Sequence, residues 1–508
     1  MAPKYFKHII TWLFVILPVI WIWGIHITDL VKIFLILFLI SLLFPTIRKY
    51  YSDSFHISGT QRKIIIFFLI IYPVLIGIQQ LARTYAGGQG INFAYHSQIV
   101  ENLSIKGGLF STLLNSDDYT PVQWITHHLN AVFYLPGMLG FAGVPGYMSL
   151  AIFEVIVIFA TIFSFKKLLA FLGYEKDIQI IFILILFCCY ALRHSYIWGV
   201  EDEFFALPLI PLIYIFYLRE KHWLVFIFIL LTFLVKESLT LFGISFSIMA
   251  FVDFIFIKKR KNFKTLLPFI ILFIISAFIF LFYFFGQTYL LNKSYEHYSK
   301  LDSVNNLFEI PVVFAKFKYY FLILLPFLFF PLWTKKGILL SIPVLPFFGL
   351  SFISGAMYNI EDYYSMIPTM IFAVVTVITL KEKKPEILKS IKLGIPILLL
   401  LIAFLFGTWK PGRIIIISLK EKYITQKVFE PLQKDLRIYT SESLFPLLTK
   451  YEKLSIFYDK NPCRKNFDLL IIRKKERDLV SDSCFTELYE AEEYKNLCGE
   501  ILFLKKKK

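Results

Sequence analysis

The sequence has little charge, few cysteines and none of the short motifs that mark common nucleotide or hydrolase sites. Charged residues make up 18% of its 508 positions, and five positions are cysteine. There is no Walker loop, dinucleotide glycine motif, HExxH or nucleophile elbow, and residues 87–90 (GGQG) lack the strand and helix context of a phosphate-binding loop. The sequence therefore does not indicate a nucleotide-binding, zinc-protease or α/β-hydrolase site.

The cysteines do not form a disulfide framework. Cys188 and Cys189 lie in an apolar run, where small buried thiols are expected. Cys463, Cys484 and Cys498 lie in the C-terminal tail and are odd in number, so at most one pair could form a bridge.

Long apolar runs dominate the chain, which is 57% hydrophobic and 19% aromatic. Inside a bilayer the backbone must satisfy its own hydrogen bonds, and apolar runs of this length do so as helices. A transmembrane barrel would need alternating segments of about ten residues, which the sequence lacks. The composition therefore predicts an all-α polytopic membrane protein.

We expect about 13 transmembrane helices. Lys4 and Lys7 precede the first run, but no convincing cleavage site follows, so we interpret that run as an uncleaved span. Residues 131–143 are short and interrupted by Pro136 and glycines, and are typical of a re-entrant or interfacial helix. The thirteen predicted spans are 9–25, 30–46, 64–81, 145–165, 178–192, 204–218, 222–235, 238–257, 265–285, 317–333, 338–354, 364–380 and 391–408.

The net charge of +17 comes from lysine and arginine clusters between the apolar runs, which is the positive-inside signal and not a nucleic-acid footprint. With the N-terminus in the cytoplasm, the basic clusters fall in the inner loops and the outer loops are poorer in Lys and Arg. We therefore expect a multi-pass membrane protein with a cytoplasmic N-terminus and an extracytoplasmic C-terminal domain. The inner clusters include Arg48, Lys49, Arg62, Lys63, Lys166, Lys167, Lys176, Arg219, Lys221, Lys258, Lys259, Arg260, Lys335, Lys336 and Lys381.

Three regions follow from this pattern. Residues 1–63 hold two helices and a basic cytoplasmic loop, and residues 64–408 form the transmembrane core with a large outer loop at 82–144. Residues 409–508 are rich in charge and predict a small extracytoplasmic α/β domain. Its expected strands are 436–440, 454–458 and 468–472, with a helix at 441–450.

Unusual polar residues collect in the predicted outer loops. Asp117 and Asp118 could act as a base toward a hydroxyl or hold a divalent cation on a phosphate-bearing donor, although the surrounding NSDDYTP is also ordinary turn sequence. His127 and His128 follow, and one of them could donate to a phosphate or simply cap an interfacial helix.

Two further groups of ionisable residues adjoin apolar runs. Glu201, Asp202 and Glu203 either complement a helix dipole or form an acidic site that a cation or basic group shares. Lys236 and Glu237 interrupt about 30 apolar residues, where ionisable groups usually face an interior cavity. The last outer group is Glu361, Asp362, Tyr363 and Tyr364.

The order of these features resembles a bacterial family of polytopic membrane proteins classed as a domain of unknown function, which is itself similar to the GT-C superfamily of membrane glycosyltransferases. The resemblance runs from about residue 83 to residue 472. The matching pieces are INFAYHSQIVENLSIKGG, HHLNAVFYLPG, VEDEFFALPLIPL, LVKESLTLF, EDYYSMIPTM and DLLIIRKK.

The resemblance implies a GT-C-like enzyme that transfers a sugar from a polyprenyl-phosphate donor on the extracytoplasmic face. Where the family's first motif carries acids, this chain has Asn92 and Ser97. The catalytic acid is then Asp117 or Asp118, or comes from residues 201–203, or the protein does not catalyse transfer. We expect catalytic roles for Asp117, Asp118, Glu203 and Glu237, and substrate binding by Asn92, His128, Lys236, Asp362 and Tyr364.

Membrane lipid and a polyprenyl-phosphate-linked sugar are the expected partners, and Mg²⁺ or Mn²⁺ is a candidate cofactor. Lys236 and His128 would stabilise the lipid-phosphate leaving group. The alternatives are a lipid-carrier or polysaccharide transporter, which predicts polar residues through the depth of the bundle, and a non-catalytic GT-C-like scaffold.

Overall fold

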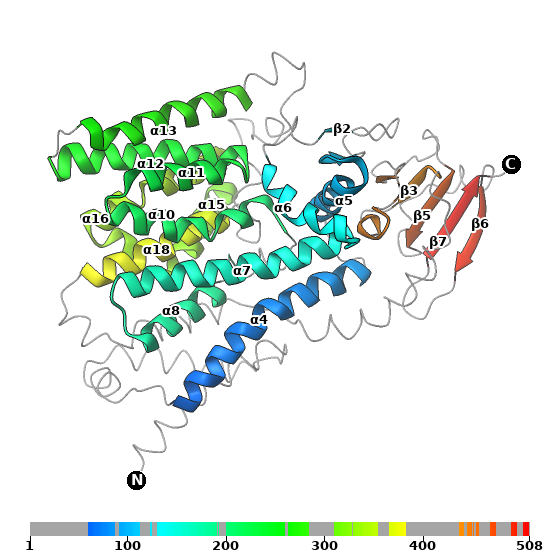
Figure 1. Ribbon diagram of the computed structural model, residues 1–508, viewed down its shortest axis with the longest axis horizontal. Helices are drawn as coiled ribbons and strands as arrows, with labels where there is room; N and C mark the ends of the chain where they lie inside the picture. Colours follow the sequence, from blue (N-terminus) through cyan, green and yellow to red (C-terminus); the bar gives the residue numbers. More distant parts are fainter. Residues whose placement is uncertain are drawn as a thin grey trace, which may run out of the picture.

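The computed structural model shows a helical body with a β-sheet at one end (Figure 1). The residues that the structure describes are 59–86, 91–111, 122–123, 130–189, 192, 200–259, 263–283, 309–327, 329–353, 365–382, 436–440, 444–449, 451, 454–456, 468–473, 489–494 and 501–506.

The protein is a multi-pass membrane protein. Among its described residues, six helical segments are long and apolar enough to cross a bilayer, and each matches a predicted span. The predicted spans at 9–25, 30–46 and 391–408 lie outside the described residues, so the expected total of 13 stays a prediction. The six segments are Ile65–Tyr85, Gly146–Phe171, Glu237–Ile257, Phe263–Leu281, Ile310–Phe327 and Lys335–Phe352.

The other four predicted spans coincide with shorter helices of 10 to 17 residues. One of these, α18 (Met366–Glu382), is buried on every side from Met366 to Leu380, which explains why its sequence is apolar all round. The others are α8 (Lys176–Cys188), α10 (Leu209–Leu218) and α11 (His222–Phe233).

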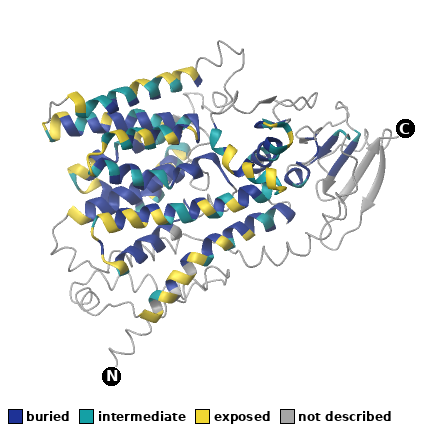
Figure 2. Ribbon diagram, in the orientation of Figure 1, coloured by how far each residue is buried: buried dark blue, intermediate teal, exposed yellow. Residues whose placement is uncertain are grey.

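The segment at 131–142 is too short to span a bilayer, in agreement with its predicted character. It consists of η3 (Ala131–Phe133), α6 (Tyr134–Gly137) and η4 (Met138–Ala142). On the side that faces away from the helical body, Met138 and Phe141 have exposed fractions of 63% and 68%. Its inner side buries Phe133 and Pro136, so the segment covers part of the helical body (Figure 2).

Two long helices, α4 (Gly59–Ala86) and α7 (Gly146–Phe171), form one flank of the helical body. They approach closely at Gly77, where an added Cβ would lie 2.5 Å from Cγ2 of Val155. Nearby, the Gln80 amide donates to the buried carboxylate of Glu154 over 3.2 Å. The two helices therefore share a polar contact inside the predicted bilayer, which the sequence analysis did not identify.

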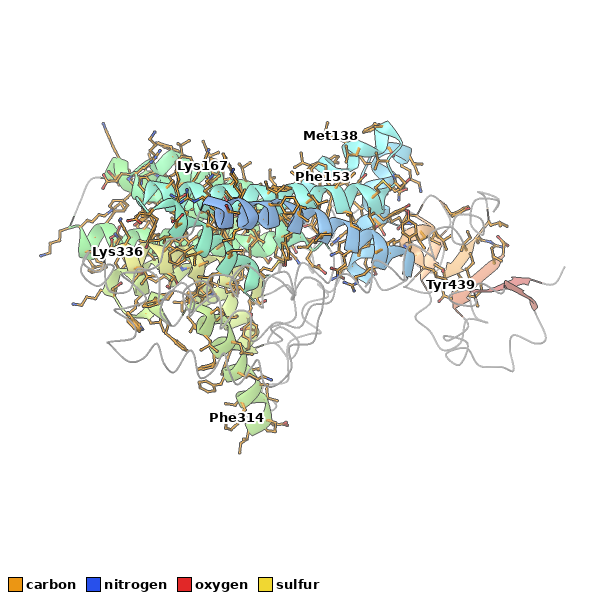
Figure 3. The ribbon with its side chains drawn as sticks, turned by 90° about the horizontal axis from the view of Figure 1, so that it is seen from below. Met138, Phe153, Lys167, Phe314, Lys336 and Tyr439 are labelled. Carbon is orange, nitrogen blue, oxygen red and sulfur yellow. The ribbon has the colours of Figure 1, made fainter. Side chains whose placement is uncertain are left out.

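Basic residues gather at one end of the body. Lys167 and Lys336 lie at the end opposite Tyr439 of the sheet (Figure 3). At the same end Arg62 pairs with Asp177 at 2.6 Å, and Lys381 donates to the Gly173 carbonyl. This segregation is what the positive-inside pattern requires, and the cytoplasmic assignment of this end remains a prediction.

The C-terminal tail forms a five-stranded mixed sheet in the order β4-β3-β5-β7-β6. Strands β3 (Ile438–Thr440), β4 (Leu454–Ile456) and β5 (Leu469–Arg473) are parallel and match the three predicted strands. Strands β6 (Tyr489–Tyr494) and β7 (Ile501–Lys506) were not predicted, and both pair antiparallel.

The predicted helix at 441–450 is wrong over its described residues. Residues 444–449 contain only a single 3₁₀ turn, η15 (Phe445–Leu447), because Pro446 has no amide hydrogen to continue a helix. The turn still has a packing role, since Phe445 is fully buried between the sheet and the helical body.

Helix α5 (Ile91–Lys106) connects the sheet to the helical body. Ala94 is fully buried in the same apolar cluster as Phe445 and Leu448 of the tail. On its other side, Phe93 belongs to the large core of the membrane helices. The start of α7 closes against this helix, where the backbone amide of Gly146 donates to the Glu101 carboxylate.

The contact between α5 and α7 predicts a strong effect of Gly146→Ala. An added Cβ would collide with the carbonyl oxygen of Ser97 and lie 3.0 Å from the Glu101 amide, so the backbones must separate. We expect a loss of about 1–3 kcal/mol in the free energy of unfolding, measured by thermal unfolding in lipid nanodiscs. Gly349→Ala is the matched control, since nothing lies within 4 Å of its Cβ position. Equal melting temperatures for the two variants would contradict this packing.

Candidate functional site

The acidic triplet of residues 201–203 is buried where the chain enters α10. It lies at the start of the 3₁₀ helix η5 (Asp202–Ala206), and all three carboxylate side chains are buried. Phe204 and Phe205 of the same turn are anchored in the core, which holds the acids inward. A surface helix start, the simpler of the two interpretations of the sequence, does not explain this burial, because buried acids need partners.

Lys236 supplies the main partner. It lies at the tip of the hairpin between α11 and η6 (Glu237–Leu239), and its side chain is itself buried. Its ammonium is 2.8 Å from Oε1 of Glu203 and 3.5 Å from Oδ2 of Asp202. Lys236 is therefore buried against two carboxylates, and its expected role in a site that faces an interior cavity stays a prediction.

His96 of α5 approaches the same carboxylate of Asp202 from another direction. Its Nδ1 lies 2.8 Å from the carbonyl oxygen of Val200, which accepts only, so Nδ1 carries a proton. Its Nε2 lies 3.0 Å from Oδ1 of Asp202. Burial alone would lower the pKa of His96, but Asp202, Glu201 and the Val200 carbonyl together raise this pKa above its ordinary value.

Two amides complete the arrangement. The Asn130 Nδ2 donates to Oδ2 of Asp202 over 2.8 Å, and the Asn92 Nδ2 donates to both carboxylate oxygens of Glu201, over 3.0 and 3.2 Å. We call this group the η5 cluster; its members are Asn92, His96, Asn130, Glu201, Asp202, Glu203 and Lys236.

Burial perturbs the acids of the η5 cluster. It raises the pKa of Glu201 to about 7, with His96 and Lys236 opposing the shift and the neighbouring acids reinforcing it. Burial also raises the pKa of Glu203, against the attraction of Lys236. A carboxyl group with a pKa near neutrality is suited to accept and release protons at physiological pH.

Glu237 is fully buried and follows Lys236 in the sequence. Its backbone carbonyl oxygen accepts a hydrogen bond from the Thr240 hydroxyl at 2.6 Å. Its turn, η6, packs against α13 (Phe263–Leu281). The structure therefore brings Glu203, Lys236 and Asn92 together, and the role of Glu237 stays a prediction.

Several predicted site residues lie outside the described residues, so their roles stay predictions. Helix α18 begins two residues after Tyr364 in the sequence, and this helix packs against η5. Ser97, which replaces a family acid, is buried and donates to the Phe93 carbonyl within α5. The residues outside the described part are Asp117, Asp118, His127, His128, Glu361, Asp362, Tyr363 and Tyr364.

His96 and Asn130 were not singled out from the sequence. His96 lies in a helix whose apolar pattern gives no sign of a charged partner. Asn130 follows His127 and His128, which were the expected polar residues of that segment. Two signals were available, because a polar residue at an otherwise buried helix position needs a partner, and Asn130 directly precedes the interfacial segment. In the described ranges, no group of three or more His, Cys, Asp or Glu side chains could hold a metal ion.

Comparison with known proteins identifies the family. The sequence model of a family described as "Predicted membrane protein (DUF2079)" matches residues 90–490, which include every member of the η5 cluster. The chain belongs to the DUF2079 family. No curated protein matches the sequence.

The fold of this DUF2079 protein resembles that of solved ArnT structures. ArnT from Cupriavidus metallidurans bound to undecaprenyl phosphate has a TM-score of 0.51 and 8% identity, covering 86% of this chain and 97% of that chain. The apo state of the same protein has a TM-score of 0.51 and 8% identity, covering 88% of this chain and 98% of that chain. The arabinofuranosyltransferase AftD from Mycobacteria gives a TM-score of 0.45 at 10% identity, covering 86% of this chain and 40% of that chain. At these identities the likeness to ArnT shows a shared fold.

Removing Lys236 should destabilise this DUF2079 protein. Lys236→Met leaves Asp202 and Glu203 buried without their ammonium partner, which costs roughly 3–5 kcal/mol in the free energy of unfolding. Thermal unfolding in nanodiscs should show this as a drop of several degrees. Lys166→Met, at an exposed position of α7, should change stability by less than about 0.5 kcal/mol. Similar melting temperatures for the two variants would contradict the ion pairing.

The raised pKa of Glu201 predicts a pH-dependent stability. An acid whose pKa is higher in the folded than in the unfolded state contributes stability below the unfolded pKa and loses it as the pH rises through the folded pKa. The wild type should therefore lose up to about 3 kcal/mol of stability, relative to Glu201→Gln, between pH 4.5 and about 7. Melting temperatures across this pH range test it, and parallel curves for the two proteins would refute it.

Proposed function

We propose that this protein is a GT-C-like glycosyltransferase that transfers a sugar from a polyprenyl-phosphate donor on the extracytoplasmic face of a bacterial cytoplasmic membrane. The observation that carries the proposal is the buried acidic η5 cluster, at the end of the helical body opposite the basic residues, in a fold shared with ArnT. The ArnT structure with undecaprenyl phosphate supports a lipid-phosphate donor by analogy of fold alone.

In the proposed reaction, Glu203 acts as the general base. Its Oε1 lies 2.8 Å from the Lys236 ammonium. Within the ranges that the structure describes, its buried Oε2 has no hydrogen-bond partner, which leaves a lone pair for an incoming hydroxyl. The acceptor hydroxyl gives its proton to Oε2, and its oxygen attacks the anomeric carbon of the sugar. The bond from that carbon to the lipid phosphate breaks, and the phosphate leaves with the electron pair and later takes the proton.

The remaining members of the η5 cluster position the base. Lys236 fixes the carboxylate of Glu203, while His96 and Asn130 hold Asp202, which in turn contacts Lys236. Glu201, with a pKa of about 7, is a second group that can exchange protons at neutral pH.

Asp117, Asp118 and Glu237 remain further candidate acids. Asn92, His128, Asp362 and Tyr364 remain candidates for binding the donor, with Mg²⁺ or Mn²⁺ as an optional bridge to its phosphate.

A second candidate function is transport of a lipid carrier or polysaccharide. The buried pair of Glu154 and Gln80 favours it, because a transporter needs polar residues within the depth of the bundle, and this pair lies between α4 and α7. Counterflow of labelled undecaprenyl-phosphoryl sugar across proteoliposomes, without transfer to an acceptor, would support the transporter over the enzyme.

Substitution of the base tests the enzyme directly. Glu203→Gln keeps the shape of the side chain and the contact of its oxygen with Lys236, but it cannot accept a proton. We expect at least a hundredfold loss of sugar transfer from an undecaprenyl-phosphoryl sugar by the purified protein in proteoliposomes. Glu175→Gln, an exposed acid at the opposite end of the body, should retain full activity. Unchanged transfer by Glu203→Gln would remove Glu203 from the mechanism.

A further inference from the structure

The η5 cluster contains two buried acceptor atoms for which the described part of the chain supplies no donor. Oδ1 of Asn130 and Oε2 of Glu203 have no hydrogen-bond partner among the described residues, although the side chains are only 1% and 4% exposed. A buried polar atom without a partner destabilises the folded state, so such atoms are rare unless a ligand or an ordered water supplies the missing hydrogen bond.

The orientation of the Asn130 amide is fixed by its neighbour. Asp202 accepts hydrogen bonds only, so the group that lies 2.8 Å from its Oδ2 must be the Nδ2 of Asn130. The other end of the amide is then the oxygen, and it has no donor. A flipped amide would place two acceptors against each other, which removes that alternative.

The orientation of Glu203 follows from the same reasoning. The ammonium of Lys236 donates to Oε1 at 2.8 Å, and the second oxygen is left without a donor. Asn130 and Glu203 are connected through Asp202 and Lys236, because Asp202 accepts from Asn130 at 2.8 Å and lies 3.5 Å from the Lys236 ammonium. Both unsatisfied atoms therefore belong to one continuous polar network.

The unmet requirement at these two atoms is for hydrogen-bond donors. A phosphate group at physiological pH offers acceptor oxygens, so it would leave these two atoms unsatisfied and would face the carboxylates of Asp202 and Glu203. A sugar ring offers several hydroxyl donors, and each can occupy one acceptor. The charge of the Lys236 ammonium is already compensated by two carboxylates, so it would attract a phosphate only weakly.

We propose that Asn130 Oδ1 and Glu203 Oε2 form a subsite for the hydroxyl groups of a sugar, and that the lipid phosphate binds elsewhere. This rests on the proposed function in taking the ligand to be a lipid-linked sugar. Asn130 is thus a specificity-determining residue that contacts the sugar. Oε2 of Glu203 has two lone pairs, so it can accept from a hydroxyl of the donor sugar with one and take the proton of the acceptor hydroxyl with the other.

Two lipids with the same tail and phosphate test the subsite. Binding of undecaprenyl phosphate and of undecaprenyl-phosphoryl-glucose to the full-length protein in nanodiscs is measured by native mass spectrometry or scintillation proximity. We expect the wild type to prefer the glucosyl lipid. Asn130→Ala should reduce that preference about tenfold, because one hydrogen bond to the sugar is lost. Glu203→Gln presents a donor in place of Oε2 and should shift the preference toward the bare phosphate lipid.

Asn102→Ala is the matched control. Asn102 is also a buried asparagine, and its Nδ2 donates to the Phe110 carbonyl at 2.8 Å, away from the η5 cluster, so its removal should leave the ratio unchanged. Equal binding of the two lipids by the wild type, or a ratio unaltered in both cluster variants, would overturn the subsite and leave ordered water as the partner of these atoms.

Failure of the subsite and failure of the proposed enzyme can be told apart. If the wild type prefers the glucosyl lipid through Asn130 but transfers no sugar, the subsite stands and the enzyme fails. If the wild type transfers sugar and neither Asn130→Ala nor Glu203→Gln alters the preference for the glucosyl lipid, the subsite fails and the enzyme stands.

Discussion

The burial of three consecutive carboxylates is the constraint on which the rest of the site depends. Acids removed from water must be protonated or paired, and at residues 201–203 the partners come from segments far apart in the sequence. Lys236 comes from the α11 hairpin, His96 and Asn92 from α5, and Asn130 from the start of the interfacial segment. The η5 cluster therefore fixes the mutual positions of four chain segments at one end of the helical body.

Helix α5 extends this constraint to the C-terminal sheet. It carries Asn92 and His96 into the η5 cluster, and Ala94 lies within the apolar cluster formed by the tail. A displacement of the sheet would therefore move α5 and change the contacts of His96. The tail is thus a structural support of the candidate site as well as a separate layer of the fold.

The sequence predicted the membrane spans, which depend on apolar length, and two of the site residues, which depend on local charge. Apolar length located the six described spans. The cost of a charge in an apolar run indicated Lys236, and the cost of three adjacent acids without a basic partner indicated Glu203. His96 and Asn130 could be recognised from the sequence only as polar residues that need a partner. The sequence does not show that this partner is Asp202, which lies more than 70 residues away from each of them in the chain. The expected helix at 441–450 gave too little weight to Pro446, and the charged sequence of β6 concealed a strand that is stabilised by its pairing with β7. The roles of the predicted acids Asp117 and Asp118 stay predictions.

The central claim is that a lipid-linked sugar binds at the η5 cluster. A cryo-EM structure of the protein in nanodiscs, with undecaprenyl-phosphoryl-glucose bound, tests it most directly. The account predicts density for the sugar within hydrogen-bond distance of Glu203 and Asn130, with the phosphate farther from the acids. Density for the headgroup at another place, with the η5 cluster closed around Lys236, would contradict it.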